Sequence, residues 1–286
     1  MGWVVFVIAA VTYILTLEST ASFWDCGEFI ASGYKLEVGH PPGNPIFMLT
    51  ARFFANFASS PSEVAYMVNL MSGLLSAATI LLLFWTITRL AQKIVLREEE
   101  TEETMSLGQM IAILGCGLVG ALAYAWSDTF WFSAVEGEVY AYSSFCTALV
   151  FWLILKWESV ADLPHANRYI ILIAYIIGVS IAVHLLNRLC IPAIVVVYYY
   201  RKYKNTDLKG SLIALLVSFV LIVLLLYGLV PGFVEVAGWV ELLFVNVFHL
   251  PFNSGVVFYF FLIVGVIAWA IYETYAQRSD KLIKIS

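Results

Sequence analysis

The chain has 286 residues, of which 62% are hydrophobic and 12% are charged, and its formal net charge at pH 7 is −5. Soluble domains carry about 25% charged residues, and a water-soluble fold of this length cannot bury so much apolar surface. The composition therefore excludes a soluble globular protein and predicts a polytopic membrane protein.

Eight apolar segments approach the length needed to cross a membrane. They fall at about residues 3–17, 64–90, 107–126, 138–156, 169–184, 189–200, 210–230 and 255–275. The fifth and sixth are short, and one long tilted helix is the alternative there, but Pro192 favours a helical pair that turns near His184–Arg188. We expect an all-α transmembrane bundle of about eight spans, a single domain over residues 1–286, with an outer loop at 231–254.

The basic residues set the expected orientation. With the N-terminus in the cytoplasm, 12 of the 15 Lys and Arg residues fall on the cytoplasmic side. These are Arg89, Lys93, Arg97, Lys156, Arg168, Arg201, Lys202, Lys204, Lys209, Arg278, Lys281 and Lys284. The outer side keeps only Lys35, Arg52 and Arg188, so both termini are expected to be cytoplasmic.

Two carboxylates stand three residues apart in residues 18–62, the outer segment after the first span. In a helix, this spacing would put Asp25 and Glu28 on one face. A carboxylate at a membrane surface can act as a general base, and a like-charged neighbour pushes its pKa towards the working pH. Two solvated loop acids, or Asp25 as a helix cap, are the plainer alternatives.

His40 follows in the same segment, beside two prolines. A rigid proline turn would hold this imidazole next to the carboxylates, where it could contact substrate; a locally hydrogen-bonded turn is the alternative. Residues 41–58 are apolar but short and are interrupted by Arg52, so we expect an outer interfacial or re-entrant helix there. The segment 18–62 is thus predicted to combine a catalytic loop with an interfacial helix.

Glu136 and Glu138 lie at the outer end of the connection between the third and fourth spans. Acidic groups near apolar spans are costly, which makes them functional candidates, although a short acidic loop is the alternative. A magnesium or manganese site is the alternative use of Asp25, Glu28, His40, Glu136 and Glu138, since their oxygen and nitrogen atoms suit these ions. No ligand spacing is diagnostic, so we expect no firm cofactor and treat a divalent metal as the less favoured reading.

The outer turn between the two short spans contains His184, Asn187 and Arg188. A phosphate leaving group needs a cation, which Arg188 or Lys35 would supply; an arginine that snorkels towards an acidic loop is the alternative. The four cysteines form no CxxC pair, which argues against a disulfide framework or a zinc site. The sequence also lacks a nucleotide-binding glycine fingerprint and a nucleic-acid-binding patch.

Several of these motifs resemble a bacterial membrane family long labelled a domain of unknown function, which has an animal relative that O-mannosylates proteins. The similarity covers most of the chain from Trp3 to about Pro192. It rests on Phe23–Ala31, Lys35–Gly43, Ser133–Tyr140, Gly178–Ser180 and His184–Asn187.

The resemblance implies a C-type glycosyltransferase fold with an acidic first outer loop. Such enzymes move a sugar from a polyprenyl-phosphate carrier to an acceptor outside the cytoplasm, and their first-loop Asp acts as catalytic base or orienter. That role maps onto Asp25, with Glu28 as the second acid. We therefore expect an inverting transferase of a mannose-like sugar to Ser or Thr of an exported protein, in a bacterial inner membrane with its site facing the periplasm. Its partners would be this donor, this acceptor and the lipid bilayer, without nucleic acid.

Two other functions stay open. A transporter or flippase would use the acids to bind a proton or cation, although their clustering at one membrane face argues against this. Members of the family commonly have more spans and a long C-terminal soluble region, so a chain that stops at Ser286 is expected to be a fragment, a split gene or a short paralogue. A catalytically silent paralogue is the other alternative function. Arg188 stands where the family pattern leads us to expect an apolar residue, so its phosphate role rests on its charge alone.

Overall fold

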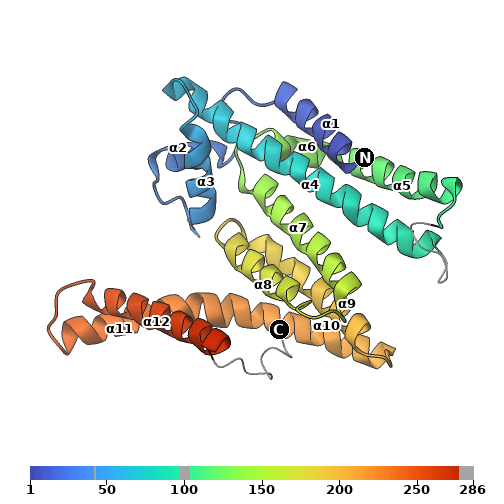
Figure 1. Ribbon diagram of the computed structural model, residues 1–286. Coiled ribbons are helices and arrows are strands. Elements are labelled where there is room, and N and C mark those ends of the chain that lie inside the picture. Colours follow the sequence, from blue (N-terminus) through green and yellow to red (C-terminus); the bar gives the residue numbers. More distant parts are fainter. Residues whose placement is uncertain (42, 97–103, 277–286) are drawn as a thin grey trace. The chain divides into compact units, whose positions relative to one another are not determined.

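A computed structural model describes residues 1–41, 43–96 and 104–276 of the chain (Figure 1). The regular structure of these residues is entirely helical, which confirms the all-α prediction. Four of the cations assigned to the cytoplasmic side, Arg97, Arg278, Lys281 and Lys284, lie outside the described residues. The chain divides into two compact units: Met1–Ser159 with Tyr169–Cys190, and Val160–Arg168 with Ile191–Ser286.

The first unit is organised around one long helix, α4, which α1 and α5 flank (Figure 1). Its elements are α1 (Gly2–Leu15), α2 (Cys26–Lys35), α3 (Pro45–Ala55), η1 (Pro61–Glu63), α4 (Val64–Val95), α5 (Leu107–Ala125), α6 (Asp128–Ala134), α7 (Val139–Val160), α8 (Arg168–Ile181) and η2 (Leu185–Cys190). The capping box of Ser106 and Gln109 fixes the start of α5, because each side chain bonds the backbone N–H of the other residue.

Two apolar clusters hold the first unit together. One joins α1, α4, α5 and α6 around buried Tyr13 and Ile80. The other joins the start of α4 to α2 and α3 through Phe29 and Phe47. Gly33 permits close packing of α2 on α3, since a Cβ atom there would lie only 2.7 Å from that of Ala51. This second cluster holds the segment 18–62, which contains Asp25 and His40.

The second unit contains α9 (Ile191–Lys202), α10 (Leu208–Val223), the π-helical segment η3 (Leu224–Leu229), α11 (Val230–Asn246) and α12 (Ser254–Ala276). The expected loop at 231–254 is wrong over most of its length, because the helix continues through η3 into α11. Pro231 lies in the first turn of α11, directly after the π-helical segment. A change of helical register there lets the chain pass a residue that has no N–H to donate.

Five described helical segments are long and apolar enough to cross a membrane: Pro61–Val95, Leu107–Ala125, Val139–Val160, Leu208–Asn246 and Ser254–Glu273. The other three expected spans correspond to α1, α8 and α9, with 14, 14 and 12 residues. At 1.5 Å per residue these helices reach about 18–21 Å, less than the roughly 30 Å of a bilayer core. The predicted break between the two short spans is present, since α8 ends at Ile181 and η2 follows.

Candidate active site

Asp25, Glu28 and His40 lie together at the start of α2. Asp25 occupies the N-cap position but makes no side-chain capping bond, and Glu28 lies in the first turn. Glu28 accepts the backbone N–H of His40 at 2.6 Å, and its other oxygen lies 3.2 Å from His40 Nδ1. His40 Nε2 is 3.9 Å from an Asp25 oxygen. The imidazole therefore stands between the two carboxylates.

The hydrogen bonds give these three groups different roles. An ionised carboxylate only accepts, so the Glu28 contact places a proton on Nδ1 of His40 and turns Nε2 towards Asp25. The His40 backbone N–H, followed by its side chain, lowers the pKa of Glu28. Glu28 therefore stays ionised as an anchor, whereas the Asp25 side chain is 59% exposed to solvent.

The chain enters this cluster through an unusual turn at Trp24. Its φ of 60° lies in the left-handed region, which is unfavourable for a bulky residue. The turn leaves the indole 91% exposed directly before Asp25. An exposed aromatic ring beside an exposed carboxylate is typical of surfaces that meet a ligand or a membrane interface.

Glu136 and Glu138 are buried, with only 4% and 5% of their surfaces exposed. Between them, Gly137 packs so tightly that a Cβ atom would lie 3.0 Å from Asn69 Oδ1. Asn69 is fully buried in α4 and donates to the carbonyls of Glu18 and Thr20 at 2.7 and 3.0 Å. Asn69 thus bonds residues 18–20 directly and packs against Gly137 of the acidic connection at the start of α4.

Burial raises the pKa of Glu138 to about 7, against an opposing hydrogen bond from the Val139 backbone. The charges of Glu136 and Asp25 raise this pKa further, while His40 lowers it. Glu138 therefore shares its electrostatic environment with the exposed cluster. Burial also raises the pKa of Glu136, opposed by a hydrogen bond with Ser22.

The turn that contains His184 packs against the same core. Ile46 in α3 donates its backbone N–H to Ala182 at 3.1 Å, and Val183 belongs to the apolar cluster of α2 and α3. The His184 ring lies 5.4 Å from that of Tyr140, in the first turn of α7. Burial, followed by the nearby charge of Arg188, lowers the pKa of His184 and favours its neutral form.

Arg188 and Asn187 are buried in η2, 5% and 1% exposed. Arg188 Nε donates to the Leu185 carbonyl at 2.9 Å, and in the described parts of the chain no carboxylate forms an ion pair with its guanidinium. Asn187 accepts from Thr147 at 2.8 Å. A buried guanidinium without a carboxylate is suited to bind an anion such as a phosphate.

Lys35 lies at the opposite end of α2 from Asp25, with its ammonium 3.8 Å from a Glu37 oxygen. Over the ten residues of α2 the separation along the axis is about 15 Å. The structure therefore brings Glu138 into the electrostatic neighbourhood of Asp25 and His40, packs the His184 turn on the same core, and leaves Lys35 apart. Asn69 was not predicted, although an amide within an apolar span was a usable signal.

Asn69→Leu is expected to lower stability, because it leaves the carbonyls of Glu18 and Thr20 without their buried donor. Each lost bond costs about 1–3 kcal/mol. Ser76→Ala is the matched control, since Ser76 is equally buried in α4 and its hydroxyl has no partner among the described residues. Thermal unfolding in detergent measures both variants, and equal midpoints would contradict the role of Asn69.

The raised pKa of Glu138 predicts a pH-dependent stability. The folded state favours the protonated acid, so the stabilisation is complete below the ordinary glutamate pKa and is lost as pH rises through about 7. The unfolding midpoint of the wild type should therefore fall by a few degrees more than that of Glu138→Gln between pH 5 and 8. Parallel pH profiles for the two proteins would contradict this assignment.

Comparisons with known proteins point to one enzyme family. The family model described as the N-terminal domain of protein O-mannosyl-transferase TMEM260 matches residues 25–207. Protein O-mannosyl-transferase TMEM260 of Mus musculus is 27% identical over 209 residues, which cover 73% of this chain and 27% of the mouse protein. The protein of the same name from Dictyostelium discoideum is 22% identical over 202 residues, covering 68% of this chain and 22% of its own length.

The chain spans about a quarter of the length of these curated relatives. No solved structure matches it. The range matched by the family model includes all nine residues predicted for the site, from Asp25 to Arg188.

Proposed function

The chain belongs to the family of protein O-mannosyl-transferase TMEM260 N-terminal domains, and from this premise we propose that it is a membrane glycosyltransferase of the O-mannosylating type. Its donor is a mannose-like sugar on a polyprenyl phosphate, and its acceptor is a Ser or Thr hydroxyl of an exported protein. The observation that carries the proposal is the exposed cluster of Asp25, His40 and Glu28 beside buried Glu138. The names of the two curated relatives support the reaction class.

In the proposed reaction, Asp25 takes the proton of the acceptor hydroxyl as its oxygen attacks the anomeric carbon of the sugar. The bond between that carbon and the phosphate oxygen breaks, and the phosphate leaves with the bonding electrons. Attack from the face opposite the leaving group inverts the anomeric centre. His40, anchored by Glu28 through two contacts, orients Asp25, while Glu136 and Glu138 line the acceptor side.

The leaving phosphate needs a positive partner, which we assign to Arg188. Its burial and its lack of a described carboxylate partner support this role. Neutral His184 and Asn187 would contact the donor beside Arg188. Lys35 is the weaker candidate, because it is exposed and paired with Glu37.

We further propose that the site faces the periplasm from a bacterial inner membrane, with both termini in the cytoplasm. The placement of 12 of the 15 basic residues on one side supports this orientation. A cysteine introduced at Lys35 should then react with an impermeant thiol reagent in intact cells, in a background that lacks the native cysteines. A cysteine at Lys204 should react only after lysis.

The reaction is tested with the purified full chain in nanodiscs, radiolabelled polyprenyl-phosphate mannose and a peptide that contains Ser and Thr. We expect label to enter the peptide and to be released by alkaline β-elimination. The same peptide with Ala at every Ser and Thr is the control. In proteoliposomes, movement of the lipid-linked sugar across the bilayer without covalent transfer would instead support the transporter.

A divalent metal is tested in the same assay. Asp25, Glu28 and His40 each offer one ligand atom, all within 4.8 Å of one another, so a cation could sit there. Because the proposed proton transfer needs no metal, we expect transfer to persist in excess EDTA. Loss of activity in EDTA that is restored by Mn²⁺ or Mg²⁺ would show that this cluster works as a metal centre.

A further inference from the structure

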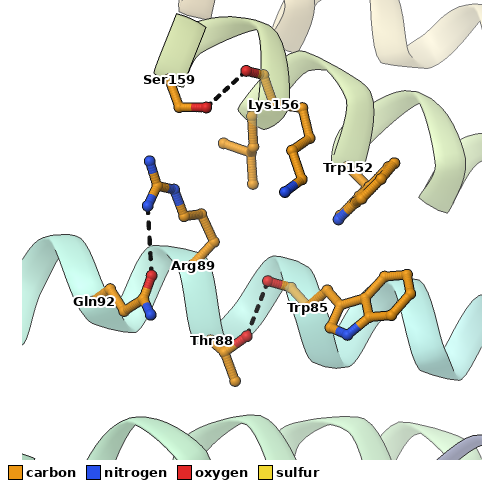
Figure 2. Close-up of a pocket in the computed structure, with 8 residues that line it drawn as sticks. Trp85, Thr88, Arg89, Gln92, Trp152, Lys156 and Ser159 are labelled. Carbon is orange, nitrogen blue, oxygen red and sulfur yellow. Dashed lines mark hydrogen bonds between the residues drawn. The ribbon is translucent and has the colours of Figure 1, made fainter. Parts of the chain in front are cut away.

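A polar cavity lies between α4 and α7, away from the acidic cluster. It has a volume of about 370 Å³ and is lined by Trp85, Thr88, Arg89, Gln92, Trp152, Leu155, Lys156 and Ser159 (Figure 2). Asn69, which holds the first outer segment, precedes Trp85 by 16 residues and Gln92 by 23 residues in α4. At 1.5 Å per residue the cavity lies roughly 24–35 Å further along that helix, about one bilayer core away.

Two cations face this cavity without a described carboxylate. Arg89 makes one long contact, 3.5 Å from Nη1 to Gln92 Oε1, and Lys156 Nζ lies 5.3 Å from the centre of the Trp152 ring. Neighbouring Lys93 differs, because it forms a 2.6 Å ion pair with Glu158. Within the described residues, the only carboxylate of α7 close to the cavity is therefore already engaged, and the lining carries two positive charges.

The other end of the cavity is aromatic. The rings of Trp85 and Trp152 lie 5.6 Å apart, inclined by 35° (Figure 2). Tryptophan favours the level of the lipid headgroups, where one side of the ring is apolar and the other is wet. Basic pockets between membrane helices bind the headgroups of anionic lipids, and a single cavity with cations and indoles suits a ligand that is itself amphipathic.

The hydroxyl groups that line the cavity favour a ligand that can donate hydrogen bonds. Thr88 donates to the Phe84 carbonyl at 2.9 Å, and Ser159 donates to the Lys156 carbonyl at 2.8 Å. Both protons are used within the helices, so these oxygens are left to accept hydrogen bonds from a ligand. They match a headgroup that carries hydroxyl donors next to its phosphate.

We propose that this cavity binds the headgroup of an anionic glycerophospholipid. Arg89 and Lys156 hold its phosphodiester, the two indoles pack against the glycerol backbone, and the hydroxyl oxygens accept from a headgroup such as glycerol. The site is distinct from the proposed donor site at Arg188 and does not rest on the glycosyltransferase proposal, because it is tested by binding alone.

Native mass spectrometry of the full chain, released from detergent with added phosphatidylglycerol or phosphatidylcholine, tests the proposal. We expect retention of phosphatidylglycerol, with an apparent affinity at least tenfold lower in Arg89→Gln/Lys156→Gln. Lys204→Gln/Lys209→Gln is the matched control, since it removes the same charge from exposed positions elsewhere. An equal loss of phosphatidylglycerol affinity in the two double variants would show that the lipid binds by non-specific charge attraction, which would overturn the proposal.

A single Lys156→Gln variant controls for misfolding of the double variant. The exposed ammonium of Lys156 donates to no described group, so its removal should leave the fold intact. The variant should weaken phosphatidylglycerol binding several-fold with an unchanged unfolding midpoint.

Soluble competitors identify the source of the phosphate. If glycerol 1-phosphate or inorganic phosphate binds as tightly as the lipid, the cavity is a phosphate site. If polyprenyl phosphate displaces phosphatidylglycerol at equal concentration, the cavity belongs to the sugar carrier. Either result would overturn the assignment.

Discussion

Replacing Asp25 by Asn is expected to lower the rate of sugar transfer by about 100- to 10,000-fold, the range that a positioned general base contributes. Asparagine keeps the size and the hydrogen-bonding oxygen but cannot take a proton. The N-cap position should tolerate it, since Asn is as good a cap as Asp and the native carboxylate makes no capping bond. The predicted loss is therefore in kcat, with little change in stability or in the KM for the lipid donor.

Glu28 is the alternative base, and its contacts argue against it. Both of its oxygens contact His40, at 2.6 and 3.2 Å, and these contacts lower its pKa. A proton on Glu28 would disrupt an interaction that positions the loop, whereas a proton on Asp25 would break no described hydrogen bond. Glu28→Gln should therefore cost less than Asp25→Asn and should act through the position of His40.

Three variants separate these roles in the transfer assay. Asp25→Asn and Glu28→Gln are compared with Asp128→Asn, which changes an exposed acid in the first turn of α6. Only the Asp25 variant should lose almost all turnover in a protein that unfolds at the wild-type temperature. Turnover close to wild type in Asp25→Asn, or a larger loss in Glu28→Gln, would move the base away from Asp25.

The closeness of Asp25 and Glu28 could be predicted from their spacing, because residues three positions apart lie on the same face of a helix. The contact of His40 with Glu28 could not be predicted in this way. It depends on the left-handed residue Leu36, with a φ of 57°, which ends α2 and turns the chain back towards Glu28. Local sequence patterns cannot predict a conformation that tertiary packing imposes on a leucine.

The burial of Glu136 and Glu138 shows a similar limit. Their cost in an apolar setting marked them as candidates, but the pattern could not show how they are held. Gly137, between the two acids, packs against Asn69, which precedes Glu136 by 67 residues in the sequence, and a side chain at Gly137 would crowd this contact. The length of α10–α11 was missed for a different reason: Pro231 is a usual sign of a helix end, and the π-helical segment before it removes the conflict.

Arg188→Leu is expected to raise the KM for the lipid-linked donor by about 10- to 100-fold, since a charge-assisted hydrogen bond contributes about 1.5–3 kcal/mol and 1.4 kcal/mol corresponds to a factor of ten. Leucine fills the buried volume of η2 without leaving an unpaired charge, so the fold should persist, although the Nε bond to the Leu185 carbonyl is lost. Arg188→Lys separates charge from packing.

Lysine keeps the positive charge but loses the bidentate geometry of the guanidinium, so Arg188→Lys should raise the donor KM less than the leucine variant does. The KM for the acceptor peptide should stay unchanged in both variants, because the phosphate leaves with the donor. The two kinetic constants therefore distinguish a phosphate contact from a purely structural arginine. If Arg188 has only a structural role, its replacement should lower stability and change both KM values alike. Another cation would then have to bind the leaving phosphate, and Lys35 is the next candidate to mutate.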